Sequence, residues 1–167
     1  MKNIREVLRA KKTHQLSTED TLKAICIDLS KDVSADLVSI WFFDEDLTMM
    51  ECQAHYDATS ETFKKGQVIE RSQYPTYFQA IIEETYVSAP DSQNQLFTRE
   101  LAKDYLIPNN IKSILDFILH EDLAPVGVIC CENRNETRNW SEADKRHLRI
   151  VATLISHRFD FKMKDSA

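Results

Sequence analysis

Two adjacent cysteines, Cys130 and Cys131, are the residues of this sequence that most resemble reactive groups. They lie near the end of an apolar run, "VGVICCE" (126–132), of the kind typical of a buried β-strand. Because successive side chains of a strand point to opposite faces, only one of the two thiols can enter a given pocket. A single cavity thiol with no activating base visible in the sequence is usually a small wall residue. We therefore expect a structural role for this thiol; the alternative is that it senses redox changes.

The other residues that could do chemistry form no recognisable catalytic or metal-binding set. Cys26 and Cys52 add no CxxC spacing and accompany no secretory signal, so neither disulfides nor zinc is indicated. The histidines have no metal-ligand spacing and are expected at the surface; they are His14, His55, His120, His147 and His157. No pair of carboxylates, Ser-His-Asp set or glycine-rich phosphate loop emerges from the spacing. The sequence thus names no metal, no cofactor and no catalytic residue.

Composition places the chain among single globular domains. It has 167 residues, of which 43% are hydrophobic, enough to bury one core. Its 21 basic and 27 acidic residues give a net charge of −6, so no broad positive field is available to hold nucleic acid. The start, "MKNIREVLRAKK", is not a secretory signal, and no apolar run approaches the ~18 residues of a membrane span. We expect a cytoplasmic protein without membrane insertion.

Hydrophobic periodicity predicts the elements that must position any site. Ser17 caps an amphipathic helix that runs to Val33, and two strands (37–46 and 50–57) follow as a hairpin, with Met50, Cys52, Ala54 and Tyr56 on one buried face. A short helix from Pro75, a brief strand near 86, another helix ended by Pro108, two strands (111–119 and 126–132) and a long helix capped by Ser141 complete the order. This order predicts an α+β fold, with an antiparallel sheet between terminal helices and short elements.

The last helix carries two apolar stripes. Docking on the sheet explains the first, which comprises Leu148, Val151, Ala152, Ile155 and Phe159. The second, formed by Ile150, Leu154 and Phe161, is displaced around the helix and suggests a partner helix. We expect a homodimer through the terminal helices, the alternative being a broadly buried helix.

Five segments in this order resemble a GAF domain, the signalling module of bacterial sensor kinases and cyclic-di-GMP enzymes. They are "VSIWFFDED", "YPTYFQAI", "YLIPNNIKSILDFIL", "PVGVICCEN" and "WSEADKRHLRIVATLIS". The resemblance covers residues 17–160, leaving a helical lead-in (1–16) and a tail or linker start (161–167). It implies a PAS-related central antiparallel sheet, with the terminal helices on one face and a ligand cavity under roof helices and loops on the other.

The resemblance also implies which residues line that cavity. They are Trp41, Phe43, Tyr74, Tyr77, Asp91, Tyr105 and Asp116, together with Cys131 as the cavity-facing member of the cysteine pair. Aromatic walls with a few fixed polar groups are typical of small-molecule sites. The alternative is an ordinary core in which Asp116 bonds backbone amides.

Departures from the family limit what can be carried over. The signature of cyclic-nucleotide-binding members is broken, because Lys145 stands where glutamate is expected. A salt bridge between Arg134 and Asp144 is still predicted to connect the loop after the last strand to the last helix. A bilin is not expected, since neither Cys130 nor Cys131 lies on a roof element. The sequence therefore predicts a non-catalytic bacterial sensor that binds an unidentified small molecule and acts on an output domain or partner. The alternatives are an enzyme similar to free methionine sulfoxide reductase and a ligand-free dimerising scaffold.

Overall fold

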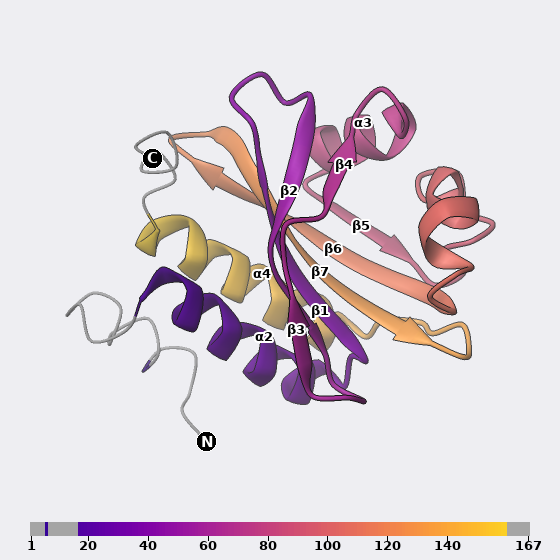
Figure 1. Ribbon diagram of the computed structural model, residues 1–167, viewed down its shortest axis with the longest axis horizontal. Helices are drawn as coiled ribbons and strands as arrows, with labels where there is room; N and C mark the ends of the chain where they lie inside the picture. The colour runs from indigo at the N-terminus through magenta and orange to yellow at the C-terminus, as the bar shows by residue number, and fades with distance from the viewer. Residues whose placement is uncertain (1–5, 7–16, 160–167) are drawn as a thin grey trace.

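An antiparallel sheet of seven strands separates two layers of helices (Figure 1). The computed structural model describes residue 6 and residues 17–159; the rest of the predicted lead-in and the predicted tail lie outside this part of the chain. The strand order is β3-β2-β1-β7-β6-β5. Strand β4 also pairs with β2, at the start of that strand, whereas β3 pairs with its end. This arrangement confirms the predicted α+β fold.

The elements follow the predicted order. The helices are α2 (Thr18–Val33), α3 (Pro75–Glu84), the 3-10 turn η1 (Arg99–Leu101), the π-helical turn η2 (Ala102–Leu106) and α4 (Glu142–Arg158). The strands are β1 (Leu37–Phe43), β2 (Met49–Asp57), β3 (Thr62–Lys64), β4 (Val68–Glu70), β5 (Tyr86–Ala89), β6 (Ile111–Glu121) and β7 (Ala124–Arg134). Sequence analysis missed β3 and β4, because three-residue strands carry too little periodicity to be recognised. None of the described helices is long and apolar enough to cross a bilayer.

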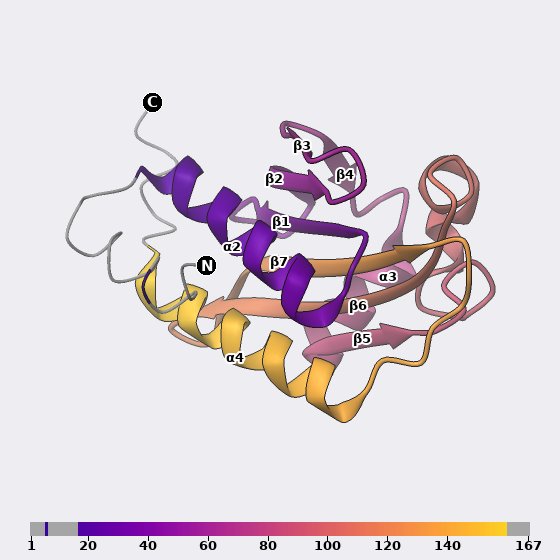
Figure 2. The same ribbon diagram turned by 90° about the horizontal axis from the view of Figure 1, so that it is seen from below.

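The terminal helices begin at the predicted caps. The Ser17 hydroxyl accepts a hydrogen bond from the backbone N–H of Asp20 at the start of α2. Ser141 and Asp144 form a capping box at the start of α4, each side chain accepting from the other's backbone N–H. Both helices therefore begin at defined points on one face of the sheet, where they lie side by side (Figure 2).

The sheet has a buried core on each face. The helix-side core includes α2 and α4 residues such as Ile25 and Ile155, and the buried members of the first predicted α4 stripe all lie in it. The opposite core lies between the sheet and the roof formed by α3, η1 and η2, and it includes Trp41, Phe78 and Leu106. Figure 1 shows α3 and the roof turns on the side of the sheet away from α2 and α4.

A bulge in β2 overturns the predicted single face of that strand. Ile40 pairs with Ala54 but Trp41 pairs with Cys52, so Gln53 is the extra residue. Consequently Cys52, like Met50, lies in the roof-side core, whereas Ala54, like Tyr56, lies in the helix-side core. At the same place the pairing partner of β2 changes from β3 to β4, and the turn between these two short strands contains Gly66, which has a φ of 91°.

Close approach of β1 and β7 requires a glycine. A Cβ at Gly127 would lie 2.3 Å from the backbone oxygen of Trp41. The same Cβ would lie 3.1 Å from the Phe42 ring and 3.3 Å from the Leu119 side chain, so glycine leaves room for these two residues of the helix-side core.

Candidate functional site

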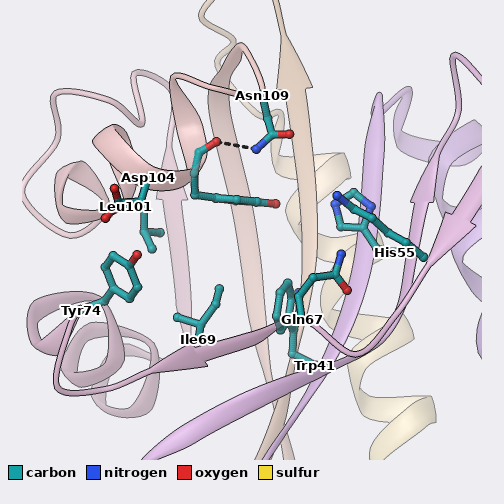
Figure 3. Close-up of a pocket in the computed structure, with 10 residues that line it drawn as sticks. Trp41, His55, Gln67, Ile69, Tyr74, Leu101, Asp104 and Asn109 are labelled. Carbon is teal, nitrogen blue, oxygen red and sulfur yellow. Dashed lines mark hydrogen bonds between the residues drawn. The ribbon is translucent and has the colours of Figure 1, made fainter.

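A cavity of about 180 Å³ lies between the sheet and the roof (Figure 3). We call it the outer cavity; it is lined by Trp41, His55, Lys64, Gln67, Ile69, Tyr74, Leu101, Asp104, Tyr105 and Asn109. Strands β1 to β4 supply one wall, and the start of α3, η1, η2 and the following loop supply the other. The site is thus assembled from segments about 70 residues apart in sequence.

A second, smaller space of about 20 Å³ adjoins it, which we call the inner chamber. The two share Trp41, Ile69, Leu101 and Tyr105, and the chamber is further lined by Ser39, Met50, Tyr77, Ile114, Asp116, Cys130 and Glu132. This volume holds about one water-sized group. The polar residues Ser39, Asp116 and Glu132 form the sheet-side floor of this chamber, and most of its other lining residues are aromatic or aliphatic.

Two buried carboxyl groups lie in the inner chamber. Asp116 of β6 and Glu132 of β7 are each 2% exposed. In the strand register Asp116 is opposite Cys130 and Glu132 is opposite Ile114, so the two carboxyls are diagonal neighbours on one face. Sequence analysis found no carboxylate pair, because only the register brings these two residues together.

Each carboxyl accepts a hydrogen bond from a roof tyrosine. The Tyr77 hydroxyl of α3 donates to Asp116 Oδ2 at 2.6 Å, and the Tyr105 hydroxyl of η2 donates to Glu132 Oε1 at 2.7 Å. The predicted alternative, in which Asp116 bonds backbone amides, is replaced by this side-chain pairing. The roof is therefore joined to the floor through these groups.

Burial changes the protonation of both acids. It raises the pKa of Asp116 to about 7, against the effect of the Tyr77 hydrogen bond. It raises the pKa of Glu132 to about 8, with the nearby Asp116 charge adding to the effect. Near neutral pH the pair therefore exchanges protons with its surroundings instead of holding two fixed negative charges.

Three buried polar atoms on the cavity walls have no hydrogen-bond partner among the described residues. They are Asp116 Oδ1, His55 Nδ1 and Gln67 Oε1. Buried polar atoms are normally paired, so such atoms call for a bound partner. His55 is only 5% exposed, and burial lowers its pKa to about 4, so the ring is neutral at neutral pH. The expectation that all histidines lie at the surface is therefore wrong for His55.

A third pocket of about 170 Å³ opens beside the outer cavity. It shares His55, Lys64 and Asn109 with the outer cavity and is bounded by Arg134, whose guanidinium pairs with Asp57 at 2.9 Å. The predicted bridge between Arg134 and Asp144 is wrong. Arg138 pairs with Asp144 instead, at 3.1 Å, and its guanidinium stacks 4.1 Å from the centre of the Trp140 ring.

The predicted site residues separate into two groups. Trp41, Tyr74, Tyr77, Tyr105 and Asp116 all line the outer cavity or the inner chamber. Phe43 instead packs in the roof-side core, 5.9 Å from the Phe78 ring centre. Asp91 belongs to a roof-loop turn, where its carboxylate accepts from the Asn94 amide.

The predicted orientation of the cysteine pair is reversed. Cys130 lies opposite Ser39 in the register and lines the inner chamber, whereas Cys131 lies opposite Val38 in the helix-side core. The two strands are not adjacent in sequence, so counting residues along each does not reveal which positions pair. All four cysteines are buried, and burial raises the pKa of Cys52 to about 12 and holds the pKa values of Cys130 and Cys131 well above the ordinary value of a thiol. These are features of wall residues and not of nucleophiles.

Several site residues were missed. Glu132, at the end of a continuously apolar run, is the one with a sequence signal, since an acid in a buried strand requires a partner. Lys64, Gln67 and Asn109 come from loops or very short strands and carry no signal of their own. In the described part of the chain, no group of three or more His, Cys, Asp or Glu residues is placed to hold a metal ion.

Comparisons with known proteins agree with this architecture. The GAF domain family model matches residues 17–159. No curated protein matches the sequence significantly.

Solved structures extend the same likeness at low sequence identity. A phycoerythrobilin-bound GAF domain from a cyanobacterial phytochrome has a TM-score of 0.75 and 15% identity, covering 98% of this chain and 97% of that one. The GAF domain of an Acinetobacter phosphoenolpyruvate-protein phosphotransferase has a TM-score of 0.70 and 16% identity, covering 94% and 93%. The chromophore-binding domain of the Stigmatella aurantiaca bacteriophytochrome has a TM-score of 0.70 and 12% identity, covering 92% of this chain and 57% of that one. At identities this low, the TM-scores of 0.70 to 0.75 show a shared fold alone.

Proposed function

This chain belongs to the GAF domain family, and from that membership we propose that it is a cytoplasmic sensor of bacterial signal transduction that binds a small molecule in the outer cavity and inner chamber. Binding shifts the packing of the terminal helices and so controls an output domain or partner. In this proposal the domain spans residues 17–160; apart from residue 6, the segments 1–16 and 161–167 lie outside the described residues.

The observation that carries this proposal is the set of unpartnered polar atoms that face one cavity. Asp116 Oδ1, His55 Nδ1 and Gln67 Oε1 come from three different segments, yet all line the connected spaces. Leaving each of them unpaired costs about 1–3 kcal/mol. A bound polar ligand, or water that the ligand displaces, offsets that cost. A filled, ligand-free scaffold would not offer this space.

The size of the cavity favours a small metabolite. At about 180 Å³ the outer cavity is smaller than the ~300 Å³ at which pockets for drug-sized ligands begin. The phycoerythrobilin named for one of the structural relatives is a large chromophore, so the likeness to that structure supports the fold and not the ligand. The wall offers neutral His55, the Lys64 ammonium and the amides of Gln67 and Asn109 as polar contacts.

A role without catalysis is supported by the state of the thiols. An activity similar to free methionine sulfoxide reductase needs a reactive thiolate, whereas burial holds the pKa of each of the four thiols far above its ordinary value. Cys130 also faces the cavity without Cys131, which lies on the other side of the sheet. The proposal therefore assigns Cys130 to the wall.

Dimerisation through the terminal helices forms the second part of the proposal. Ile150 of α4 is 45% exposed and Leu154 is half-buried, so the second apolar stripe remains available to a second copy of the chain. The third member of that stripe, Phe161, lies outside the described residues.

A matched pair of tryptophan substitutions tests ligand binding. Ile69 faces the outer cavity, whereas its neighbour Val68 on the same strand is 48% exposed. We expect Ile69→Trp to fill the cavity and Val68→Trp to leave it open. Native mass spectrometry of freshly purified protein should then show a retained small-molecule mass on the wild type and on Val68→Trp, but not on Ile69→Trp. Equal masses for all three proteins, after incubation with a bacterial metabolite extract, would contradict binding in this cavity.

A further inference from the structure

The inner chamber is rich in hydrogen-bond acceptors and has no positively charged side chain in its lining. Asp116 and Glu132 supply four carboxyl oxygens, and the two tyrosine hydroxyls are already used, one on each acid. The Trp41 indole N–H is also used, because it donates to Ser39 Oγ at 2.8 Å. Asp116 Oδ1 is left without a donor although the residue is 2% exposed. Besides the protons that the two acids themselves carry, the donors left to the chamber are the Ser39 hydroxyl and the weakly donating Cys130 thiol, and no positively charged side chain lines it.

The volume of the chamber limits which group can supply further donors and a positive charge. About 20 Å³ holds one water-sized group, which is the size of a primary ammonium. An ammonium has three N–H donors, a positive charge and no acceptor. Trp41, Tyr77 and Tyr105 line the same space, and aromatic rings add to the stability of a bound cation. An anionic group would instead meet two acids.

We propose that the inner chamber binds the ammonium group of a small primary amine between Asp116 and Glu132, with the rest of the molecule lying in the outer cavity. This inference rests on the proposed ligand-binding function and names the class of ligand. The hydroxyl groups of Tyr77 and Tyr105 hold the two carboxyls in place, and Asp116 Oδ1 receives the N–H donor that it lacks. His55, Gln67 and Asn109 contact the remainder of the ligand.

Ammonium binding is coupled to the protonation of the pair. Asp116 is faced by Tyr77, Cys130 and Glu132, and Glu132 is faced by Tyr105 and Asp116, with Lys64 and Arg134 near enough to act on its charge. Burial favours the protonated acids in the empty chamber, whereas an ammonium favours the ionised ones. Binding therefore releases protons, and the affinity for an amine rises with pH across the range in which the pair titrates.

The two indole N–H groups give a direct readout in the intact protein. Trp41 lies at the chamber, whereas Trp140, the other tryptophan of the chain, lies in the helix-side core. In 1H–15N spectra of the full chain, ethylammonium chloride should shift the Trp41 indole signal saturably and leave the Trp140 signal in place. Ethanol, sodium acetate and potassium chloride at matched ionic strength serve as neutral, anionic and inorganic-cation probes.

Three variants locate the binding. Asp116→Asn and Glu132→Gln keep the shape of each side chain and should each weaken ethylammonium at least about 10-fold. Asp122→Asn, at the exposed turn between β6 and β7 and away from both spaces, should change it by less than about 3-fold. Raising the pH from about 6 to about 8 should strengthen binding at least about 10-fold in the wild type, because ethylammonium stays charged throughout. That pH dependence should be reduced in both acid variants.

Several outcomes overturn the proposal. It falls if ethylammonium causes no saturable shift at Trp41, if Asp116→Asn binds it unchanged, or if potassium chloride produces the same saturable shift. Saturable binding of acetate or ethanol alone would remove the amine while leaving a small-molecule sensor in place. The tryptophan pair at Ile69 and Val68 tests that broader function separately, so the two failures can be told apart.

Discussion

Tyr77 and Asp116 join the roof helix α3 to strand β6 through a buried hydrogen bond of 2.6 Å, across 39 residues of sequence. Tyr77 is 1% exposed and Asp116 2%, so water does not compete for this bond. A second bond of the same kind, from Tyr105 of η2 to Glu132 of β7 at 2.7 Å, also joins the roof to the floor. The stability of the roof and the charge of the cavity therefore depend on the same two bonds.

The first prediction concerns the bond between Tyr77 and Asp116. Tyr77→Phe removes the donor and leaves Asp116 with a second unpartnered oxygen, so the free energy of unfolding should fall by about 1–3 kcal/mol, measured by urea denaturation. Tyr86→Phe is the matched control, because the Tyr86 ring stacks on Phe117 and the residue is 43% exposed. Equal effects of the two substitutions would show that the bond contributes nothing of its own.

The second prediction concerns pH. An acid whose pKa is raised in the folded state binds its proton more tightly there than in the unfolded chain, so its contribution to stability is lost as pH rises towards the folded pKa. For Asp116 and Glu132 those folded values are about 7 and about 8, both well above the ordinary range. His55 acts in the opposite sense, but its lowered pKa of about 4 confines its effect to acidic solution.

Between about pH 6.5 and about pH 8 only the acid pair should therefore matter, and the free energy of unfolding should fall by on the order of 1–2 kcal/mol. Thermal unfolding over this range should show the decline in the wild type. A flatter profile is expected for Asp116→Asn and for Glu132→Gln. A stability that rises with pH in this window would contradict the assigned burial of the two acids.

The third prediction concerns Arg138, which connects three segments. Its guanidinium donates to the backbone oxygens of Val33 and Ser34 at the end of α2 and to Asp144 at the start of α4, while it stacks on Trp140. Lysine keeps the charge but cannot make this set of planar contacts. Arg138→Lys should lower the free energy of unfolding by about 1–3 kcal/mol, whereas Arg146→Lys, at an exposed position on α4, should change it by less than about 0.5 kcal/mol.

The fourth prediction concerns the thiols. Since all four cysteines are buried and their pKa values are raised, Ellman's reagent should label none of them within minutes in the native protein at about pH 8. In urea it should label all four. Fast labelling of one native thiol, lost in Cys130→Ser, would instead favour a redox role for the cavity cysteine.

The fifth prediction concerns the proposed dimer. Placing a charge in the second stripe of α4 with Ile150→Asp should shift the protein towards monomer in analytical ultracentrifugation. Leu96→Asp is the control, because Leu96 is 57% exposed in the loop between β5 and η1, away from the terminal helices. A wild-type protein that sediments as a monomer at high concentration would remove the dimer from the proposal.

The fold was accessible from sequence because its signals are local. Ser17 and Ser141 mark helix starts, and the apolar runs at β1, β6 and β7 are long enough to be read as strands. The site was accessible only in part. The family resemblance points to Trp41, Tyr77 and Asp116, but Glu132 joins Asp116 only through the pairing of β6 with β7.

The errors have the same origin. The orientation of Cys130 and Cys131 depends on the register between β1 and β7, and the split face of β2 depends on the bulge at Gln53. Both are long-range pairings, and a shift of one residue reverses every side chain after it. Arg138 was overlooked for the same reason, since its partners on α2 are about 105 positions away.

Strand β7 places Cys130 against the cavity and Cys131 against the helices, so a single peptide bond separates the two environments. Ligand preference and helix geometry consequently share one structural element. A substitution along β7 that adapts the cavity to a new molecule also alters the surface on which α4 rests. In this domain, a change of ligand specificity during evolution would be expected to require compensating changes in the terminal helices.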